Sequence, residues 1–215
     1  MPEQIRPEDI EKRSFEIITE ELQERGFQRD VTTGQLSVIK RCIHTTADFD
    51  YSETLCFSDG AVETFQSLIR EGATVVTDTN MALSGINKQE LKGYGCDAVC
   101  FMADADVASE AVKKGVTRAS VSMNRAMSIP GPVIFVIGNA PTALITLREC
   151  YDAGMYTPAF VIGVPVGFVN VVDAKELITE SDIPYIVNRG RKGGSNVAAA
   201  IVNALLYDMR GYDQK

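Results

Sequence analysis

The amino-acid sequence predicts a single α/β domain: a mostly parallel sheet of about five strands with helices on both faces, preceded by a helical N-terminal section. From residue 73 onward, short apolar runs rich in β-branched residues alternate with helical patterns, which is typical of βαβ units with right-handed crossovers. The runs are continuously apolar, as in sheets buried on both faces. The linkers are short, so we expect residues 1–215 to form one domain.

The N-terminal section should contain three helices. The first covers residues 7–25 and carries Ser14 on its apolar stripe. That serine either bonds back to a helix carbonyl or points into a site. The second helix begins at Thr32, which forms a capping-box pattern with Gln35. The third covers residues 59–72, between an aspartate cap and a glycine stop.

Five segments in the remainder of the chain have the pattern of a strand followed by polar or small residues. These strand candidates are 73–82, 97–106, 131–143, 158–168 and 184–196. The helical patterns between and after them cover 87–95, 107–127, 141–154, 170–180 and 194–209. Ligands of open α/β sheets bind beyond the carboxyl ends of the strands, so we expect a binding site among these polar and glycine-containing ends.

Composition excludes several classes of function. The net charge of −8 makes nucleic acid a poor partner, because phosphate binding needs clustered lysine and arginine. No apolar run approaches the ~20 residues that span a bilayer, and the N-terminus lacks the apolar region of a secretory signal. We therefore expect a cytoplasmic protein that does not bind membranes or nucleic acid.

Cysteine usage predicts neither a disulfide framework nor a metal site. The chain has five cysteines, an odd number, and none lie in a CxxC pattern. Cys96 and Cys100 could share a metal, but no histidine is near them in sequence. Buried thiols are the interpretation we prefer.

The last strand end carries basic residues beside a helix start. Arg189, Arg191 and Lys192 precede Gly193 and Gly194, which open the final helix. Basic side chains at a helix N-terminus attract carboxylates or phosphates, and glycines let the backbone approach a ligand closely. We interpret this segment as an anion site; a flexible glycine turn with solvated charges is the alternative.

His44, the only histidine of the chain, lies on a polar face near the end of the second helix. It shares that face with Arg41, Thr45 and Asp48, three or four residues apart. Imidazole has an unperturbed pKa of ~6.5 and exchanges protons near neutrality. Asp48 and the helix C-terminus would favour the protonated form, which can act as a general acid. A purely structural histidine is the alternative.

Seven segments support a family resemblance, in consistent order and over nearly the whole chain. They are RSFEII (13–18), VIKRCIHTTADFD (38–50), VTDTNMALSGI (76–86), TRAS (117–120), VIGNAPTAL (136–144), VIGVPVGFVN (161–170) and NRGRKGGSNVAAAIVNAL (188–205). Together they resemble the precorrin-8X methylmutase family, whose anaerobic-route members are called cobalt-precorrin-8 methylmutases.

The resemblance implies an isomerase of cobalamin biosynthesis. Such an enzyme moves a methyl group between adjacent carbons of ring C of precorrin-8X or cobalt-precorrin-8, giving hydrogenobyrinate or cobyrinate. It implies a corrinoid substrate with many carboxylates, a homodimer with sites near the subunit interface, and no cofactor or metal of its own. A methyl shift of this kind needs the conjugated ring polarised, and a proton donated near ring C would do that.

The resemblance also implies roles for particular residues. The catalytic histidine of the family falls on His44, which would exchange a proton with the macrocycle. Ser14 and Arg41 match the substrate-contacting serine and arginine, and Arg118 of the TRAS segment is a further expected contact. We add Lys192 and Gly193 to the expected substrate-binding residues, because a lysine and a helix start suit carboxylates. We also add Thr45, which shares the polar face of His44.

Two other functions are compatible with the same residues. A hydrolase would use Ser14 or Ser195 with His44 and Asp48, and it would need a serine within hydrogen-bond reach of the imidazole. A non-catalytic tetrapyrrole carrier would bind the product and survive the loss of its histidine. The familiar nucleotide, serine-hydrolase and zinc-protease motifs are absent from the sequence.

Overall fold

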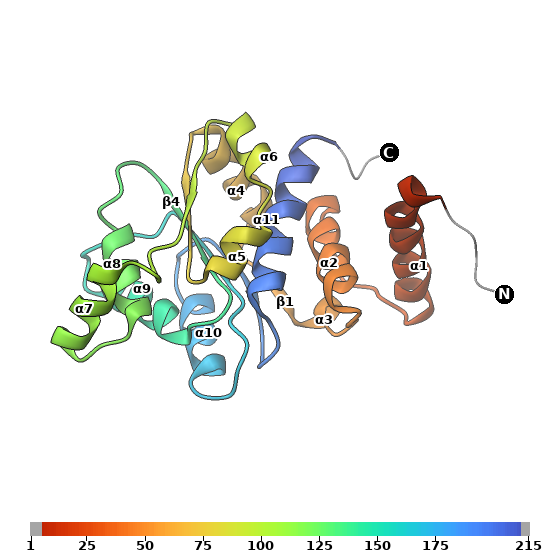
Figure 1. The fold of residues 1–215 in the computed structure, drawn as a ribbon. Coiled ribbons are helices and arrows are strands. Elements are labelled where there is room, and N and C mark those ends of the chain that lie inside the picture. Colours follow the sequence, from red (N-terminus) through yellow and green to blue (C-terminus); the bar gives the residue numbers. More distant parts are fainter. Residues whose placement is uncertain (1–5, 212–215) are drawn as a thin grey trace.

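A six-stranded sheet lies between two layers of helices in the computed structural model, which describes residues 6–211 (Figure 1). The strand order is β1-β6-β5-β4-β2-β3, and every pair is parallel except β1 with β6. The strands are β1 (Leu55–Phe57), β2 (Thr74–Thr77), β3 (Ala98–Val99), β4 (Val133–Ile137), β5 (Phe160–Gly163) and β6 (Tyr185–Asn188). The predicted fold class is confirmed.

The sequence pattern did not predict β1, which makes the sheet one strand wider than expected. Its three residues pair antiparallel with β6, with Leu55 opposite Asn188 and Phe57 opposite Ile186. A segment this short has no periodicity of its own. Only a partner more than 120 residues away along the chain makes it a strand.

Helices cover both faces of the sheet (Figure 1). Those whose buried side chains join the core of the first face are α1 (Ile10–Glu24), α2 (Thr33–Thr46), α3 (Tyr51–Thr54), α4 (Ala61–Arg70), α6 (Lys88–Gly93) and α11 (Ser195–Met209). Those on the second are α8 (Arg118–Ala126), α9 (Pro141–Asp152) and α10 (Val171–Thr179). The 3-10 turn η1 (Pro7–Asp9), α5 (Asn80–Gly85) and α7 (Ala105–Lys114) complete the order.

Central strand β4 joins the two hydrophobic cores because its side chains alternate between the faces. Ile134 and Val136 pack with the first layer, while Phe135 and Ile137 pack with the second. All four side chains are fully buried, which explains the continuous apolar run in the sequence.

Helices α2 and α11 lie side by side, with α1 outermost (Figure 1). The capping box predicted at Thr32 is present: its hydroxyl accepts from the Gln35 N–H, and the Gln35 side chain accepts from the Thr32 N–H. The start of α2 meets the end of α11, since a Cβ at Gly34 would lie 3.5 Å from Asp208 Oδ2. The two helices therefore run antiparallel, which brings the end of α2 to the start of α11.

Candidate active site

A cavity of about 510 Å³ runs along α11, and His44 forms part of its wall. This volume is within the usual range for small-molecule sites. The α1 and α2 side supplies Glu11, Arg41, His44 and Thr45. Three of the predicted site residues thus meet in one cavity.

The imidazole of His44 is exposed and held by an aromatic neighbour. The residue lies in the last turn of α2, which ends at Ala47 in the left-handed conformation (φ 54°). Its ring stacks on Phe15 of α1, with centroids 5.2 Å apart and planes inclined by 13°. The stack orients the ring while leaving it accessible to a ligand in the cavity.

Arg41 lies one turn before His44 and is buried to 8% exposure. Its Nη1 donates to Glu11 Oε1, and its guanidinium also lies over the rings of Phe15, at 4.5 Å, and Tyr207, at 5.3 Å. Thr45 Oγ1 donates to the Arg41 carbonyl at 2.9 Å. The guanidinium is thus fixed at the cavity wall by an ion pair and two aromatic faces.

The opposite wall of the cavity is the polar stripe of α11. Asn196, Asn203, Tyr207 and Arg210 line it. The small residues Gly85, Ala199 and Ala200 and the polar residues Asn87 and Glu90 complete the lining. Sequence reasoning missed this wall. The signal was present, because these four polar residues recur at intervals of seven, four and three along a helix whose other residues are mostly apolar.

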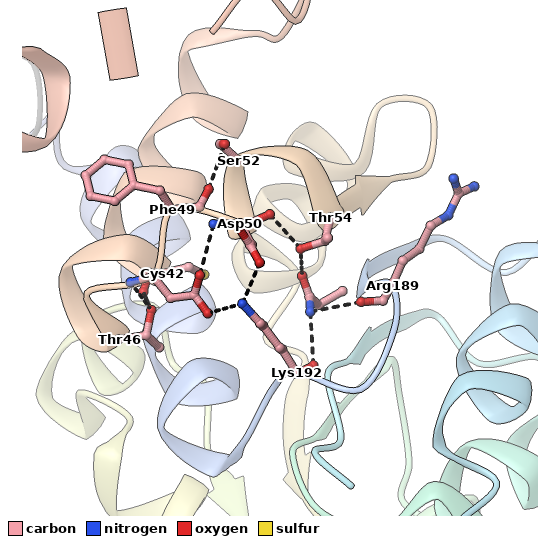
Figure 2. A network of polar contacts seen from close by, with 10 residues as sticks. Cys42, Thr46, Phe49, Asp50, Ser52, Thr54, Arg189 and Lys192 are labelled. Atoms are coloured by element: carbon pink, nitrogen blue, oxygen red, sulfur yellow. Dashed lines mark hydrogen bonds and ion pairs between the residues drawn. The ribbon is translucent and has the colours of Figure 1, made fainter. Parts of the chain in front are cut away.

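Lys192, which we expected in an anion site, donates to two aspartates (Figure 2). Its Nζ donates to Asp48 Oδ2 at 2.5 Å and to Asp50 Oδ2 at 2.6 Å. The hydrogen bond from Lys192 lowers the pKa of Asp48 below its ordinary value. Asp48, expected beside His44, is therefore paired with Lys192, and this network ties the end of α2 to the loop after β6.

Gly193 makes a close backbone contact that a side chain would block. A Cβ at this position would lie 2.1 Å from the Val164 carbonyl oxygen. The preceding loop is held by Lys175, whose Nζ donates to the Gly190 carbonyl at 2.7 Å and the Lys192 carbonyl at 2.8 Å. Burial lowers the pKa of Lys175 to about 8. This buried lysine holds the loop between β6 and α11 in place. Sequence analysis did not identify it.

A second predicted ligand position, the strand ends of β2 and β4, is filled by the protein itself. Asp78 is fully buried, and its carboxylate accepts from the backbone N–H groups of Gly138, Asn139 and Ala140 at 2.6–2.9 Å. Burial raises the pKa of Asp78, against these three donors that lower it. The amides that could have held an anion at the start of α9 are therefore occupied by Asp78.

Two predicted contacts, Ser14 and Arg118, lie outside the wall of this cavity in the part of the chain described. The Ser14 hydroxyl donates to the Ile10 carbonyl at 2.9 Å. Of the two interpretations of Ser14, this is the bond back to its own helix. Arg118 is exposed at the start of α8, in the other helical layer. Both stay predictions from the family resemblance.

The geometry does not support the hydrolase alternative. The Ser195 hydroxyl bonds with Thr79 Oγ1 at 2.8 Å, Ser14 is bound to its own helix, and Asp48 is paired with Lys192. The serine, histidine and aspartate are not assembled into a relay. Within residues 6–211, no group of three or more His, Cys, Asp and Glu side chains is placed to hold a metal ion. No helix among them has the length and apolarity to cross a membrane.

Comparisons with known proteins agree on one family. The family of precorrin-8X methylmutases matches residues 9–208. The cobalt-precorrin-8 methylmutase of Salmonella typhimurium is 45% identical over 206 residues, covering 95% of this chain and 96% of that protein. The enzyme of the same name from Priestia megaterium is 40% identical, covering 95% and 89%. A crystal structure of precorrin-8X methylmutase from Thermus thermophilus superposes with a TM-score of 0.85 at 37% identity, covering 95% and 98%.

Proposed function

This chain belongs to the precorrin-8X methylmutase family, and we propose that it is an isomerase of cobalamin biosynthesis that moves a methyl group on ring C of a precorrin-8 macrocycle. The observation that carries the proposal is the place of His44, exposed in the wall of a cavity that a ligand can enter. The isomerisation gives hydrogenobyrinate from precorrin-8X or cobyrinate from cobalt-precorrin-8.

His44 acts as the proton donor and acceptor in this proposal. A methyl migration within one molecule breaks one C–C bond and forms another, so it needs no nucleophile, hydride or resident metal. A proton delivered near ring C polarises the conjugated system and is returned once the methyl has moved. The Phe15 stack holds the imidazole ring in place at the cavity.

Arg41 binds a substrate carboxylate beside the reacting ring. Guanidinium groups bind carboxylates through two parallel N–H bonds, and Glu11 already occupies such a position in the free protein. Thr45 lines the same stretch of wall. Ser14 and Arg118 remain predicted substrate contacts on the strength of the resemblance. Lys192 and Gly193 remain so because a lysine beside a helix start suits a carboxylate.

We further propose that the natural substrate carries cobalt. Relatives that are 45% and 40% identical are named cobalt-precorrin-8 methylmutases, which favours the cobalt form. The metal belongs to the substrate, so the protein needs no ligands of its own for it.

A homodimer is part of the proposal, as the resemblance implies. Its support is exposed apolar side chains, Met81 in α5 and Phe168 and Val169 in the loop before α10, which are 70%, 82% and 76% exposed. Exposed apolar surface marks interaction sites. Light scattering on the purified protein should give twice the mass of one chain, and the monomer mass would contradict it. The cytoplasmic location stays a prediction from the sequence.

The test of function is incubation with precorrin-8X and, separately, with cobalt-precorrin-8. Moving the methyl group changes the chromophore, so visible absorption follows the reaction directly. We expect conversion of both to be measurable and that of the cobalt form to be faster. If the protein binds the corrinoid but the absorption spectrum stays that of the unreacted substrate, the protein is a carrier. That result would contradict the proposal.

A further inference from the structure

We propose that Arg210 is a second carboxylate-binding position of the cavity, held ready by Glu90. This inference rests on the proposed function, since it assigns to Arg210 one of the peripheral carboxylates of the corrinoid. Arg210 is the C-cap of α11 and lines the same cavity as His44 and Arg41, although it follows them by more than 160 residues in the sequence.

The position of Arg210 follows from the helix that carries it. Asn203, Tyr207 and Arg210 recur at intervals of four and three, so they share one face of α11. The Arg41 guanidinium lies over the Tyr207 ring at 5.3 Å. Arg210 is one helical turn beyond that ring, a rise of about 4.5 Å. Two arginines from different helices thus flank Tyr207 on the cavity wall.

The ion pair between Arg210 and Glu90 leaves the guanidinium open to a ligand. Nη1 of Arg210 donates to Glu90 Oε1. The Arg210 side chain is 56% exposed, whereas that of Glu90 is only 14% exposed. The carboxylate is therefore the anchored partner and the guanidinium the accessible one. Since a guanidinium carries five N–H donors, it can bind a carboxylate of the substrate while it keeps its bond to Glu90.

Glu90 is itself fixed by contacts between α6 and α11. Its backbone N–H donates to Asn87 Oδ1, the N-cap of α6, at 3.2 Å. The Asn87 backbone N–H donates to Asn203 Oδ1 at 2.8 Å, and Asn87 Nδ2 donates to Tyr207 Oη at 3.2 Å. These bonds are made without a ligand, so the position is organised in advance and loses little side-chain freedom on binding.

Charge argues for a carboxylate as the group bound. The chain carries a net charge of −8, so an anionic substrate needs local cations to overcome the global field. Arg41 and Arg210 supply two within one cavity, and each is balanced by one glutamate in the free protein. A substrate carboxylate would share Arg210 with Glu90, and the negative charge of Glu90 would weaken that binding.

The test is titration of the full-length protein with hydrogenobyrinate, followed by visible absorption, using Arg210→Gln and a matched control. Arg25→Gln is that control: Arg25 is the C-cap of α1, is 56% exposed, and pairs with Glu21, but it does not line the cavity. We expect Arg210→Gln to raise the Kd about fivefold, the size of an exposed charge pair, and Arg25→Gln to leave it unchanged. For the methyl ester of hydrogenobyrinate, Arg210→Gln and the wild type should bind equally.

A second variant, Glu90→Gln, keeps an oxygen acceptor for Arg210 but removes the competing charge, so it should bind hydrogenobyrinate more tightly than the wild type. An Arg210→Gln protein with the wild-type Kd for hydrogenobyrinate would overturn the inference, as would a Glu90→Gln protein that binds no more tightly. Both results leave the proposed function standing. A wild-type protein that neither binds nor converts a corrinoid would instead overturn the proposed function itself.

Discussion

At the scale of single residues, the two basic side chains near the end of α2 have different partners. His44 meets an aromatic ring and the cavity, while Lys192 meets two carboxylates in the network of Figure 2. The Lys192 ammonium donates to both aspartates at once. Its first effect is to hold the loop after β6 against the end of α2.

Replacing Lys192 by Met should therefore lower stability in a pH-dependent way. Lys192 lowers the pKa of Asp48 in the folded state, so the pair stabilises the fold above the ordinary aspartate value of 3.8, and this contribution disappears as pH falls through the lowered pKa. Because the lysine is exposed to solvent, we expect a loss of only ~0.5 kcal/mol at pH 7.

Urea unfolding of the wild type and of Lys192→Met between pH 7 and pH 3 measures this difference. The difference in stability between the two proteins should shrink toward the acid end, and Lys192→Arg should follow the wild type because it keeps the charge. A difference that stays constant across this pH range would show that the ion pair is not its source.

At the scale of elements, α2 is the helix whose placement matters most for the site. It carries Arg41, His44 and Thr45 on its last turns, and its start is fixed by the Thr32 capping box. The cap stabilises the end of the helix farthest from His44. It therefore contributes to folding without touching the cavity.

Thr32→Ala should destabilise the protein by about 1 kcal/mol, since it removes the cap acceptor, while leaving the Kd for hydrogenobyrinate unchanged. Chemical denaturation measures the first quantity and absorption titration the second. Thr33→Ala is the matched control, one residue further along and inside the helix, and its stability should stay close to that of the wild type. A loss of binding in Thr32→Ala would contradict this separation of roles.

The sequence predicted helices and strands correctly wherever residues within a single segment determine the element. The capping box of α2, the five apolar strands and the start of α11 after Gly194 all follow from residues within one segment. Strand β1 did not, because its pairing with β6 is non-local. Helix α8 begins at Arg118 after its own Thr117 cap, which divides one expected helical pattern into two.

The candidate site was predictable only in part, for the same reason. Arg41, His44 and Thr45 share a helix face, so their spacing alone brings them together. Glu11, Glu90 and Arg210 reach the cavity through the packing of α1, α6 and α11, which no local pattern contains. The roles expected of Lys192 and Gly193 depended on a partner and a packing distance that the sequence does not record.

At the scale of the whole molecule, the two cores share one sheet. Because neighbouring residues of β4 belong to opposite cores, neither layer of helices can detach without exposing part of that strand. We therefore predict that the chain unfolds as one domain. Tyrosine fluorescence and far-ultraviolet circular dichroism should give the same urea midpoint, whereas two separate midpoints would reveal two independent units.

The most direct measurement is the turnover of His44→Ala on cobalt-precorrin-8, together with its affinity for cobyrinate. The imidazole is exposed and outside both cores, so the variant should fold and bind the corrinoid with a Kd near that of the wild type. Without a proton donor, its rate should fall by ~10²–10⁴-fold. A variant that binds cobyrinate and still converts the substrate at the wild-type rate would contradict the account.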